Sequence, residues 1–189
     1  MDTIGKVEIP KRTPEQEREF TRLLIVARGI NPEIIYNRCA QYFQCDNWLA
    51  ATWMGGAPGG IDNKKVHSLR IADNGSYAIW VKDQKESEKV ENEPEHKIGS
   101  DEHLDKAKIT LEERLLLELK SYSDNKKHLD ETEPCVCDGS YVLEAVKAKD
   151  KSKNRVSVRW MNTNAGGKMV VQSWYGKPSG AYGTREIIG

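Results

Sequence analysis

The chain has 189 residues, 38% of them apolar, and its 29 basic and 29 acidic side chains leave no formal net charge. This length is enough for one compact core or two small ones. No run approaches the roughly eighteen apolar residues of a membrane helix, and residues 1–19 are mostly polar, which argues against a signal peptide. We therefore expect a cytoplasmic protein with no membrane partner.

The N-terminal part indicates two helices joined by a glycine turn. Thr13-Pro14-Glu15-Gln16 has the spacing of a capping box with proline at the first helical position. Apolar residues recur at helical spacing over 20–27, and Gly29 is a natural helix end. A second helix starts at Asn31-Pro32-Glu33 and runs to Gly55. The pattern predicts an αα-hairpin that contributes to the core, whereas a DNA-binding helix-turn-helix would need a shorter second helix.

A β-hairpin is predicted next. The segments 66–72 and 76–82 alternate apolar and polar side chains on either side of a three-residue turn that ends in glycine. This turn places Ile71 opposite Tyr77 and gives one continuous apolar face. The opposite face carries two candidate binding residues, Arg70 and Trp80.

The middle of the chain is charged. Residues 83–109 have almost nothing apolar to bury, which is typical of a flexible linker or an exposed loop. A further helix starts at the capping box Thr110-Leu111-Glu112-Glu113 and has leucines and Tyr122 at helical spacing. Residues 123–139 are polar and predict a loop, and the glycine-rich tail after Gly176 predicts a mobile end.

The last third of the chain predicts a three-stranded antiparallel meander. The segments 141–149, 154–161 and 168–175 are rich in β-branched and aromatic residues and are separated by turn-forming runs.

The register decides which residues share a face of this meander. We expect Lys149 to pair with Asn154, and Met161 to pair with Lys168. The outer face then gains two cross-strand pairs, Glu144 with Arg159 and Arg155 with Trp174. The inner face then consists of apolar side chains: Leu143, Ala145, Val156, Val158, Trp160, Met169 and Val171.

Together these elements predict an α+β protein with three parts. Residues 1–82 form the αα-hairpin plus the β-hairpin, and residues 83–109 form the charged linker or loop. Residues 110–189 form one helix followed by the antiparallel meander and its mobile tail. The two sheet segments either stay separate or join into one sheet or a small barrel.

No stretch of the chain carries a specific catalytic or cofactor motif. The glycines of residues 55–60 are not followed by the Lys-Ser/Thr pair that a phosphate-binding P-loop requires. Cys135 and Cys137 form one close pair, but a structural zinc site draws four ligands from two spaced pairs. We therefore expect no cofactor and no metal, and the sequence leans against enzymatic activity without deciding it.

The C-terminal part is the basic part of the chain. Residues 138–189 carry nine basic and four acidic side chains, whereas residues 82–137 carry ten and sixteen. Cations beside an exposed tryptophan are typical of nucleic-acid binding, because cations contact phosphates and the indole stacks on an unpaired base. We therefore expect a DNA- or RNA-binding accessory protein. Its candidate contact residues are Lys147, Lys149, Lys151, Lys153, Arg155, Arg159, Lys168, Trp174, Arg70 and Trp80.

A protein partner is the alternative. Tryptophan and arginine are also enriched among the residues that dominate protein interfaces, so the same surface fits both kinds of partner. Under this alternative the protein is an adaptor, an assembly component or an inhibitor of a larger complex. The sequence decides neither between these partners nor the oligomeric state.

Overall fold

The computed structural model describes residues 7–49, 61–72, 75–89, 105–147, 150–164, 166–174 and 182–189, with the backbone alone for residues 143–147, 150–154 and 174. The protein is a mixed α+β protein, as expected. Three helices occur in the described residues: α1 (Pro14–Glu19), α2 (Pro32–Cys39) and α3 (Leu111–Asn125).

The larger of two sheets contains seven strands: β2 (Cys45–Trp48), β3 (Val66–Ser68), β5 (Glu88–Lys89), β6 (Cys135–Lys147), β7 (Asp150–Thr163), β8 (Gly166–Trp174) and β9 (Gly183–Thr184). Their order is β2-β8-β7-β6-β9-β5, and β3 pairs with β6 outside this path. Strands β6, β7 and β8 are antiparallel neighbours, which confirms the predicted meander. β2 runs parallel to β8, and β9 runs parallel to β6.

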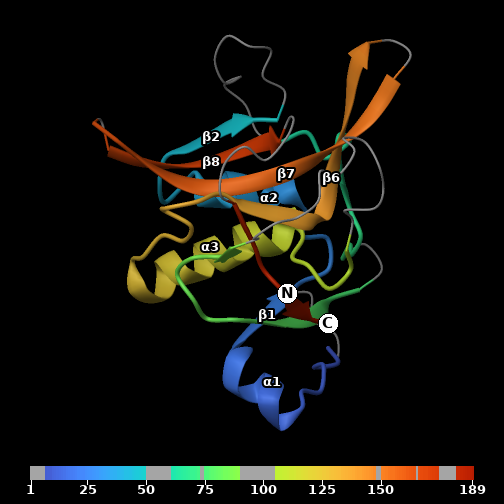
Figure 1. The fold of residues 1–189 in the computed structure, drawn as a ribbon, viewed down its shortest axis with the longest axis vertical. Helices are drawn as coiled ribbons and strands as arrows, with labels where there is room; N and C mark the ends of the chain where they lie inside the picture. The colour runs from blue at the N-terminus through green and yellow to red at the C-terminus, as the bar shows by residue number, and fades with distance from the viewer. Residues whose placement is uncertain are drawn as a thin grey trace.

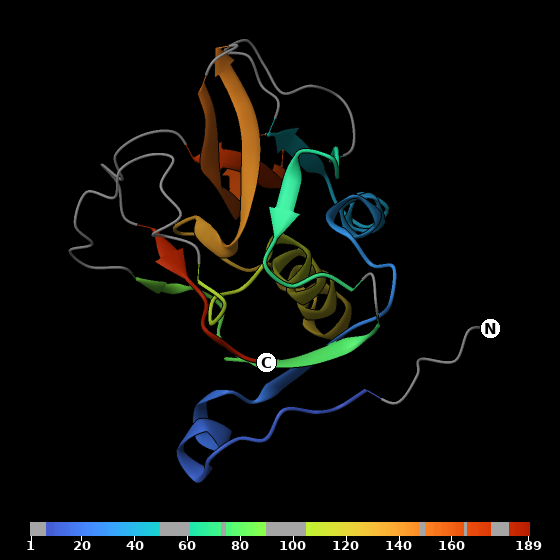
Figure 2. The same ribbon diagram turned by 90° about the vertical axis from the view of Figure 1, so that its right-hand side faces the viewer.

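The smaller sheet contains three strands: β1 (Arg22–Val26), β4 (Tyr77–Val81) and β10 (Ile187–Ile188). β4 lies in the middle and pairs antiparallel with both neighbours. Figures 1 and 2 show α3 between the two sheets and α1 beyond the smaller sheet. Neither sheet closes into a barrel within the described strands.

The main core surrounds α3. This helix starts at the predicted capping box, where the Thr110 and Glu113 side chains each accept a hydrogen bond from the other residue's amide. Leu111 and Leu115 are completely buried and belong to one apolar cluster with residues of both sheets. Burial of each such side chain stabilises the fold by about 1.5–3 kcal/mol. The helix therefore holds the two sheets together.

The predicted αα-hairpin is wrong, because residues 22–26 form β1 instead of continuing a helix. The first helix ends at Glu19, and in β1 the side chains alternate: Leu24 and Val26 are buried, whereas Ile25 is 42% exposed. A short apolar run fits both a helix and a strand, and here the pairing with β4 decides for the strand.

The second predicted helix is shorter than expected. α2 starts at the expected cap, where the Asn31 side chain accepts a hydrogen bond from the amide of Ile34. It ends at Cys39, and residues 45–48 form the edge strand β2. The expected helical continuation is therefore replaced by a strand that extends the larger sheet. Residues 50–60, which include the glycine-rich run, lie outside the described residues.

The predicted β-hairpin of residues 66–72 and 76–82 is also wrong. β3 pairs with β6 in the larger sheet, and both edges of β4 are occupied by β1 and β10. Ile71, expected opposite Tyr77 on an apolar face, is 55% exposed. Apolar and polar side chains alternate along a strand whichever strand it pairs with. This alternation therefore does not reveal that residues 66–72 and 76–82 belong to different sheets.

One register of the meander is confirmed and the other is wrong. Met161 lies opposite Lys168, as predicted for β7 and β8. Glu144, however, pairs with Ser152 and not with Arg159. Residues 150–153, predicted as a turn, belong to β7, and β6 begins at Cys135 within the predicted polar loop. The expected inner face is confirmed for the side chains that the structure describes, all of them buried: Val156, Val158, Trp160, Met169 and Val171.

Both segments predicted as mobile contain ordered residues. In the charged connector, residues 88–89 form β5, and the amide of Ser87 donates a hydrogen bond to Asp130; residues 90–104 lie outside the described residues. In the tail, residues 182–189 carry β9 and β10, and Arg185 is 2% exposed. The tail prediction is wrong for these eight residues, since they pair with strands of both sheets.

Candidate functional site

Two of the predicted nucleic-acid contacts on the meander are paired with carboxylates. The Nε and Nη2 atoms of Arg155 lie 2.8 Å and 2.7 Å from Asp138 Oδ1, and its Nη1 donates a 3.3 Å hydrogen bond to the hydroxyl of Tyr182. Lys168 forms an ion pair with Asp46. Separating such partly buried pairs costs free energy, which reduces their availability to a phosphate.

Among the remaining meander candidates, the structure describes the side chain of Arg159. Arg159 is partly buried, and its Nε has no hydrogen-bond partner among the described residues. The backbone of Trp174 pairs with Arg155 as predicted, but its side chain is not described, so its stacking role stays a prediction. Lys149 lies outside the described residues. The side chains of three further lysines are also not described: Lys147, Lys151 and Lys153.

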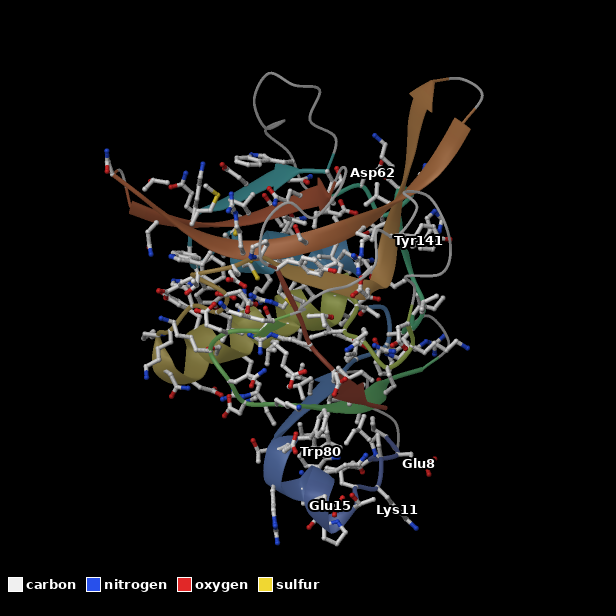
Figure 3. All side chains as sticks on the ribbon, in the orientation of Figure 1. Glu8, Lys11, Glu15, Asp62, Trp80 and Tyr141 are labelled. Atoms are coloured by element: carbon white, nitrogen blue, oxygen red, sulfur yellow. The ribbon has the colours of Figure 1, made fainter. Side chains whose placement is uncertain are left out.

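Arg70 and Trp80 do not share a surface. Arg70 makes a two-pronged ion pair with buried Glu113, with nitrogen to oxygen distances of 2.8 Å and 2.7 Å. The Trp80 indole donates a 3.0 Å hydrogen bond to the Pro10 carbonyl, and the Arg12 guanidinium lies 3.5 Å from its ring centre. Figure 3 shows Trp80 on the side of the smaller sheet that faces α1. Both residues are thus engaged by their own chain, at separate places.

A different group of cations and rings lines an open groove between α2 and α3. The groove has a volume of about 240 Å³, and Tyr42 on its wall is 48% exposed. The Arg38 guanidinium lies 5.0 Å from the ring centre of Tyr42, and the Lys126 ammonium lies 4.8 Å from that of Tyr122. We call this site the α2–α3 groove; its lining residues are Arg38, Tyr42, Leu119, Tyr122, Ser123 and Lys126.

A packed cluster of rings supports one wall of the groove. The ring centre of Phe43 lies 5.1 Å from that of Tyr122 and 5.1 Å from that of His128, both in edge-to-face geometry. His128 in turn stacks on Trp160, with ring centres 3.2 Å apart. Edge-to-face and offset contacts of this kind stabilise aromatic pairs beyond their burial. The orientation of Tyr122 is therefore fixed by rings that reach to β7.

The ends of the two helices place the cations of the groove. After α2, the amides of Tyr42 and Phe43 both donate to the carbonyl of Cys39, at 2.9 Å and 3.1 Å, and keep the chain in a tight turn. α3 ends at Asn125, and the residue that caps it, Lys126, has a left-handed backbone (φ 57°) and an amide that donates to the carbonyl of Tyr122. A cation at the C-terminal end of a helix is favoured by the helix dipole.

The positive charge at this groove is not compensated within the described residues. Arg38 and Lys126 take part in no ion pair there, unlike Arg155 and Lys168. Asp124, the acid that ends α3 beside the groove, is already shared by Lys120 at 3.2 Å and by an arginine of β1 at 3.1 Å. The Arg38 guanidinium donates a 2.5 Å hydrogen bond to the neutral side chain of Gln41. Within the part of the chain that the structure describes, the groove therefore presents two cations without a carboxylate partner next to aromatic rings.

A buried network of charges anchors α3 beneath the groove. Arg114 donates to Asp130 at 2.8 Å and to Glu118 at 2.9 Å, and Arg185 donates to the second oxygen of Asp130 at 2.9 Å. All four side chains are at most 2% exposed. Burial lowers the pKa of Arg114, but Asp130 and Glu118 outweigh this effect, and the pKa lies above its ordinary value. His128 Nδ1 lies 2.9 Å from Glu118, which connects the network to the aromatic cluster.

A second polar cluster joins α3 to β3 and β6. The Ser68 hydroxyl lies 2.6 Å from a carboxylate oxygen of Glu112 and 2.7 Å from the hydroxyl of Ser140. The Ser140 hydroxyl also accepts a 2.9 Å hydrogen bond from the amide of Leu111. Glu112 is 2% exposed, and this burial raises its pKa to about 7. One carboxyl at the start of α3 thus titrates near neutral pH.

The four cysteines are free thiols. Burial raises the pKa of Cys45 to about 12, and it raises those of Cys39 and Cys137 further above the ordinary value. Such thiols stay protonated at neutral pH and are weak nucleophiles. Within the residues that the structure describes, no three His, Cys, Asp or Glu side chains are placed to hold a metal ion together.

No family model, curated protein or solved structure matches this chain. In the described part of the chain, no helix combines the length and the apolar character that are needed to cross a membrane.

The sequence contains a signal for the groove that its apolar pattern hides. Tyr122 lies on the predicted apolar stripe of its helix, and Tyr42 lies within the second predicted helix, although both line the groove. Arg38 precedes Tyr42 by four residues, and Tyr122 precedes Lys126 by four. Side chains at this spacing meet on one face of a helix. Two such cation and tyrosine pairs, each at a helix end, could have indicated the groove.

Proposed function

We propose that this protein is a non-enzymatic interaction subunit that binds a protein partner through the α2–α3 groove. The observation that carries the proposal is the pair of tyrosines, Tyr42 and Tyr122, each accompanied by a cation that has no carboxylate partner in the described residues. Tyrosine and arginine dominate binding energy at protein interfaces, because they combine a large contact area with hydrogen-bonding groups.

The surface beside the groove supports the same proposal. Ile34 lies one helical turn before Arg38 on α2, so the two side chains share a face of the helix. Ile34 is 48% exposed, as is Tyr42. The Arg38 guanidinium also lies 5.0 Å from the Tyr42 ring centre, so a partner meets an exposed isoleucine, a cation and an exposed tyrosine at neighbouring places.

Nucleic-acid binding is the competing proposal, and the contacts favour it less. Arg70, Arg155 and Lys168 are all paired with carboxylates of the same chain. Binding to a nucleic-acid backbone depends on several cations that each neutralise a phosphate. Those three cations would first have to leave their present partners.

Site-directed photo-crosslinking separates the two proposals. A photoreactive phenylalanine analogue replaces Tyr42 in the groove, and in a matched variant it replaces Ile71, which is 55% exposed and does not line the groove. Each full-length variant is irradiated in lysate of its source cells, with and without nuclease treatment, and the adducts are identified by mass spectrometry.

We expect the variant at position 42 to form a discrete protein adduct that survives nuclease treatment and is absent from the variant at position 71. Loss of the adduct after nuclease treatment would favour nucleic acid as the partner. No adduct at position 42, or the same adducts at both positions, would overturn the proposal.

A further inference from the structure

We infer that the segment bound in the α2–α3 groove is acidic and carries one large apolar or aromatic side chain as its anchor. The inference rests on the proposed function and adds the chemistry of the partner. The anchor packs between Tyr42 and Tyr122 against Leu119. Carboxylates on either side of the anchor meet Arg38 and Lys126.

The size of the groove sets the size of the anchor. Its volume of about 240 Å³ lies below the range of roughly 300–1,000 Å³ that pockets for whole small molecules occupy. A nucleotide or a cofactor would therefore project out of it, whereas one side chain would fill it. Two rings and a leucine make most of the wall apolar, and the hydroxyls of Ser123 and of the two tyrosines are the uncharged polar groups of the lining.

The charge balance at the groove selects an anionic segment. Arg38 and Lys126 are uncompensated in the described residues, and exposed Lys127 adds a third cation at the same end of α3. The C-terminal end of a helix carries roughly half a negative charge, which opposes an anion. Three positive charges outweigh this half charge, so the local field favours carboxylates.

The neighbouring cations favour a short acidic segment over a nucleic-acid strand. A strand that left the groove would need further free cations along its path. Two cations at the end of α3, Arg22 and Lys120, are both held by Asp124. These two neighbours are therefore less available to a strand that continues past the groove, whereas the cations of the groove suit two or three carboxylates around one anchor.

A peptide titration tests the inference. The full-length protein is titrated with the peptide EDEWEDE, with its neutral counterpart QNQWQNQ, and with EDEAEDE, which lacks the anchor. Backbone amide NMR spectra report binding up to millimolar peptide and locate it on the chain. We expect EDEWEDE alone to shift the amides of Tyr42, Tyr122 and Ser123 in a saturable way, with an affinity that falls as salt is added.

Charge and ring variants assign the contacts. Arg38→Glu and Lys126→Glu should each weaken binding of EDEWEDE on the order of tenfold, because an attraction becomes a repulsion. Arg28→Glu is the matched control, since Arg28 is also exposed and does not line the groove. Tyr42→Phe should preserve binding and Tyr42→Ala should weaken it, because the ring and not the hydroxyl makes the contact. Thermal melting of every variant confirms that it is folded.

The outcomes distinguish this inference from the proposed function. Equal binding of EDEWEDE and QNQWQNQ, or no shift in the groove, overturns the inference, while a nuclease-resistant adduct at position 42 still supports the proposed function. Stronger binding of a single-stranded oligonucleotide than of EDEWEDE, abolished by Arg38→Glu, assigns the groove to nucleic acid and overturns both. Concentration-dependent dimers that Arg38→Glu abolishes assign it to a second copy of the chain and overturn the acidic partner.

Discussion

Replacement of Glu112 by glutamine should change how the stability of the protein depends on pH. Glu112 is 2% exposed, and burial raises its pKa from the ordinary 4.5 to about 7. Hydrogen bonds from Ser68 and Thr110 act in the opposite direction but do not cancel the effect of burial. The folded protein therefore keeps this carboxyl protonated at a pH where the unfolded chain has already lost the proton.

The sign and the size of the effect follow from this difference. Between about pH 4.5 and about pH 7, unfolding releases the proton of Glu112, so a rising pH lowers the free energy of unfolding. A rise of the pKa from 4.5 to about 7 corresponds to about 3 kcal/mol, since one pKa unit is worth about 1.4 kcal/mol. Glutamine has the same size and no proton to lose. The wild type loses about 3 kcal/mol of its free energy of unfolding between about pH 4.5 and about pH 7, and Glu112→Gln does not. The stability of Glu112→Gln relative to the wild type should therefore rise by about 3 kcal/mol over this range.

Urea unfolding of both proteins at several pH values measures this gain. Other titrating groups occur in both chains, so they cancel when the two free energies of unfolding are subtracted. Glu113→Gln is the matched control: Glu113 is equally buried and adjacent in sequence, but it is paired with Arg70. That variant should be less stable by about 1.5–3 kcal/mol at every pH of the range, because it weakens the charged hydrogen bonds between Glu113 and the partly buried Arg70. If the difference in free energy of unfolding between Glu112→Gln and the wild type were constant over the whole range, Glu112 would not carry a raised pKa in the folded protein.

Three further predictions concern the core. Asp130→Ala leaves two buried arginines without their shared carboxylate, so the free energy of unfolding measured in urea should fall by about 3–5 kcal/mol. An unchanged urea midpoint would show that the buried charge network does not stabilise the fold. In Gly167→Ala, the added methyl group would overlap the Trp160 indole, so a loss of about 1–3 kcal/mol and a changed near-ultraviolet circular dichroism spectrum are expected. Cys45, whose pKa is raised to about 12, and the three other free thiols should react with a disulfide reagent at neutral pH only after unfolding; rapid reaction of the native protein would show that they are accessible.

Local signals in the sequence are sufficient for the elements that depend on neighbouring residues. The capping boxes at Thr13 and Thr110 mark the true starts of α1 and α3. The pairing of Met161 with Lys168 is correct, because the short turn between β7 and β8 leaves one register that keeps the apolar face together. In each case the deciding residues lie within a few positions of one another.

The features that depend on distant partners are not accessible in this way. Residues 22–26 become a strand because β4 lies beside them, and β6 takes its register from a turn that differs from the predicted one. The groove is a more severe case, since Tyr42 follows α2, Tyr122 belongs to α3, and their exposure depends on how these two parts meet. The helical spacing of apolar residues places a tyrosine ring on an apolar face of a helix. It does not show whether another helix or strand covers that ring.

The position of residues 182–189 in the fold constrains how the protein is made. β10 completes the smaller sheet, β9 adds to the larger one, and Arg185 between them neutralises Asp130 in the core. During synthesis, residues 22–81 leave the ribosome long before these partners exist. The nascent chain must therefore hold its apolar strands without their final neighbours, and chaperones can act on it until residues 182–189 have left the ribosome.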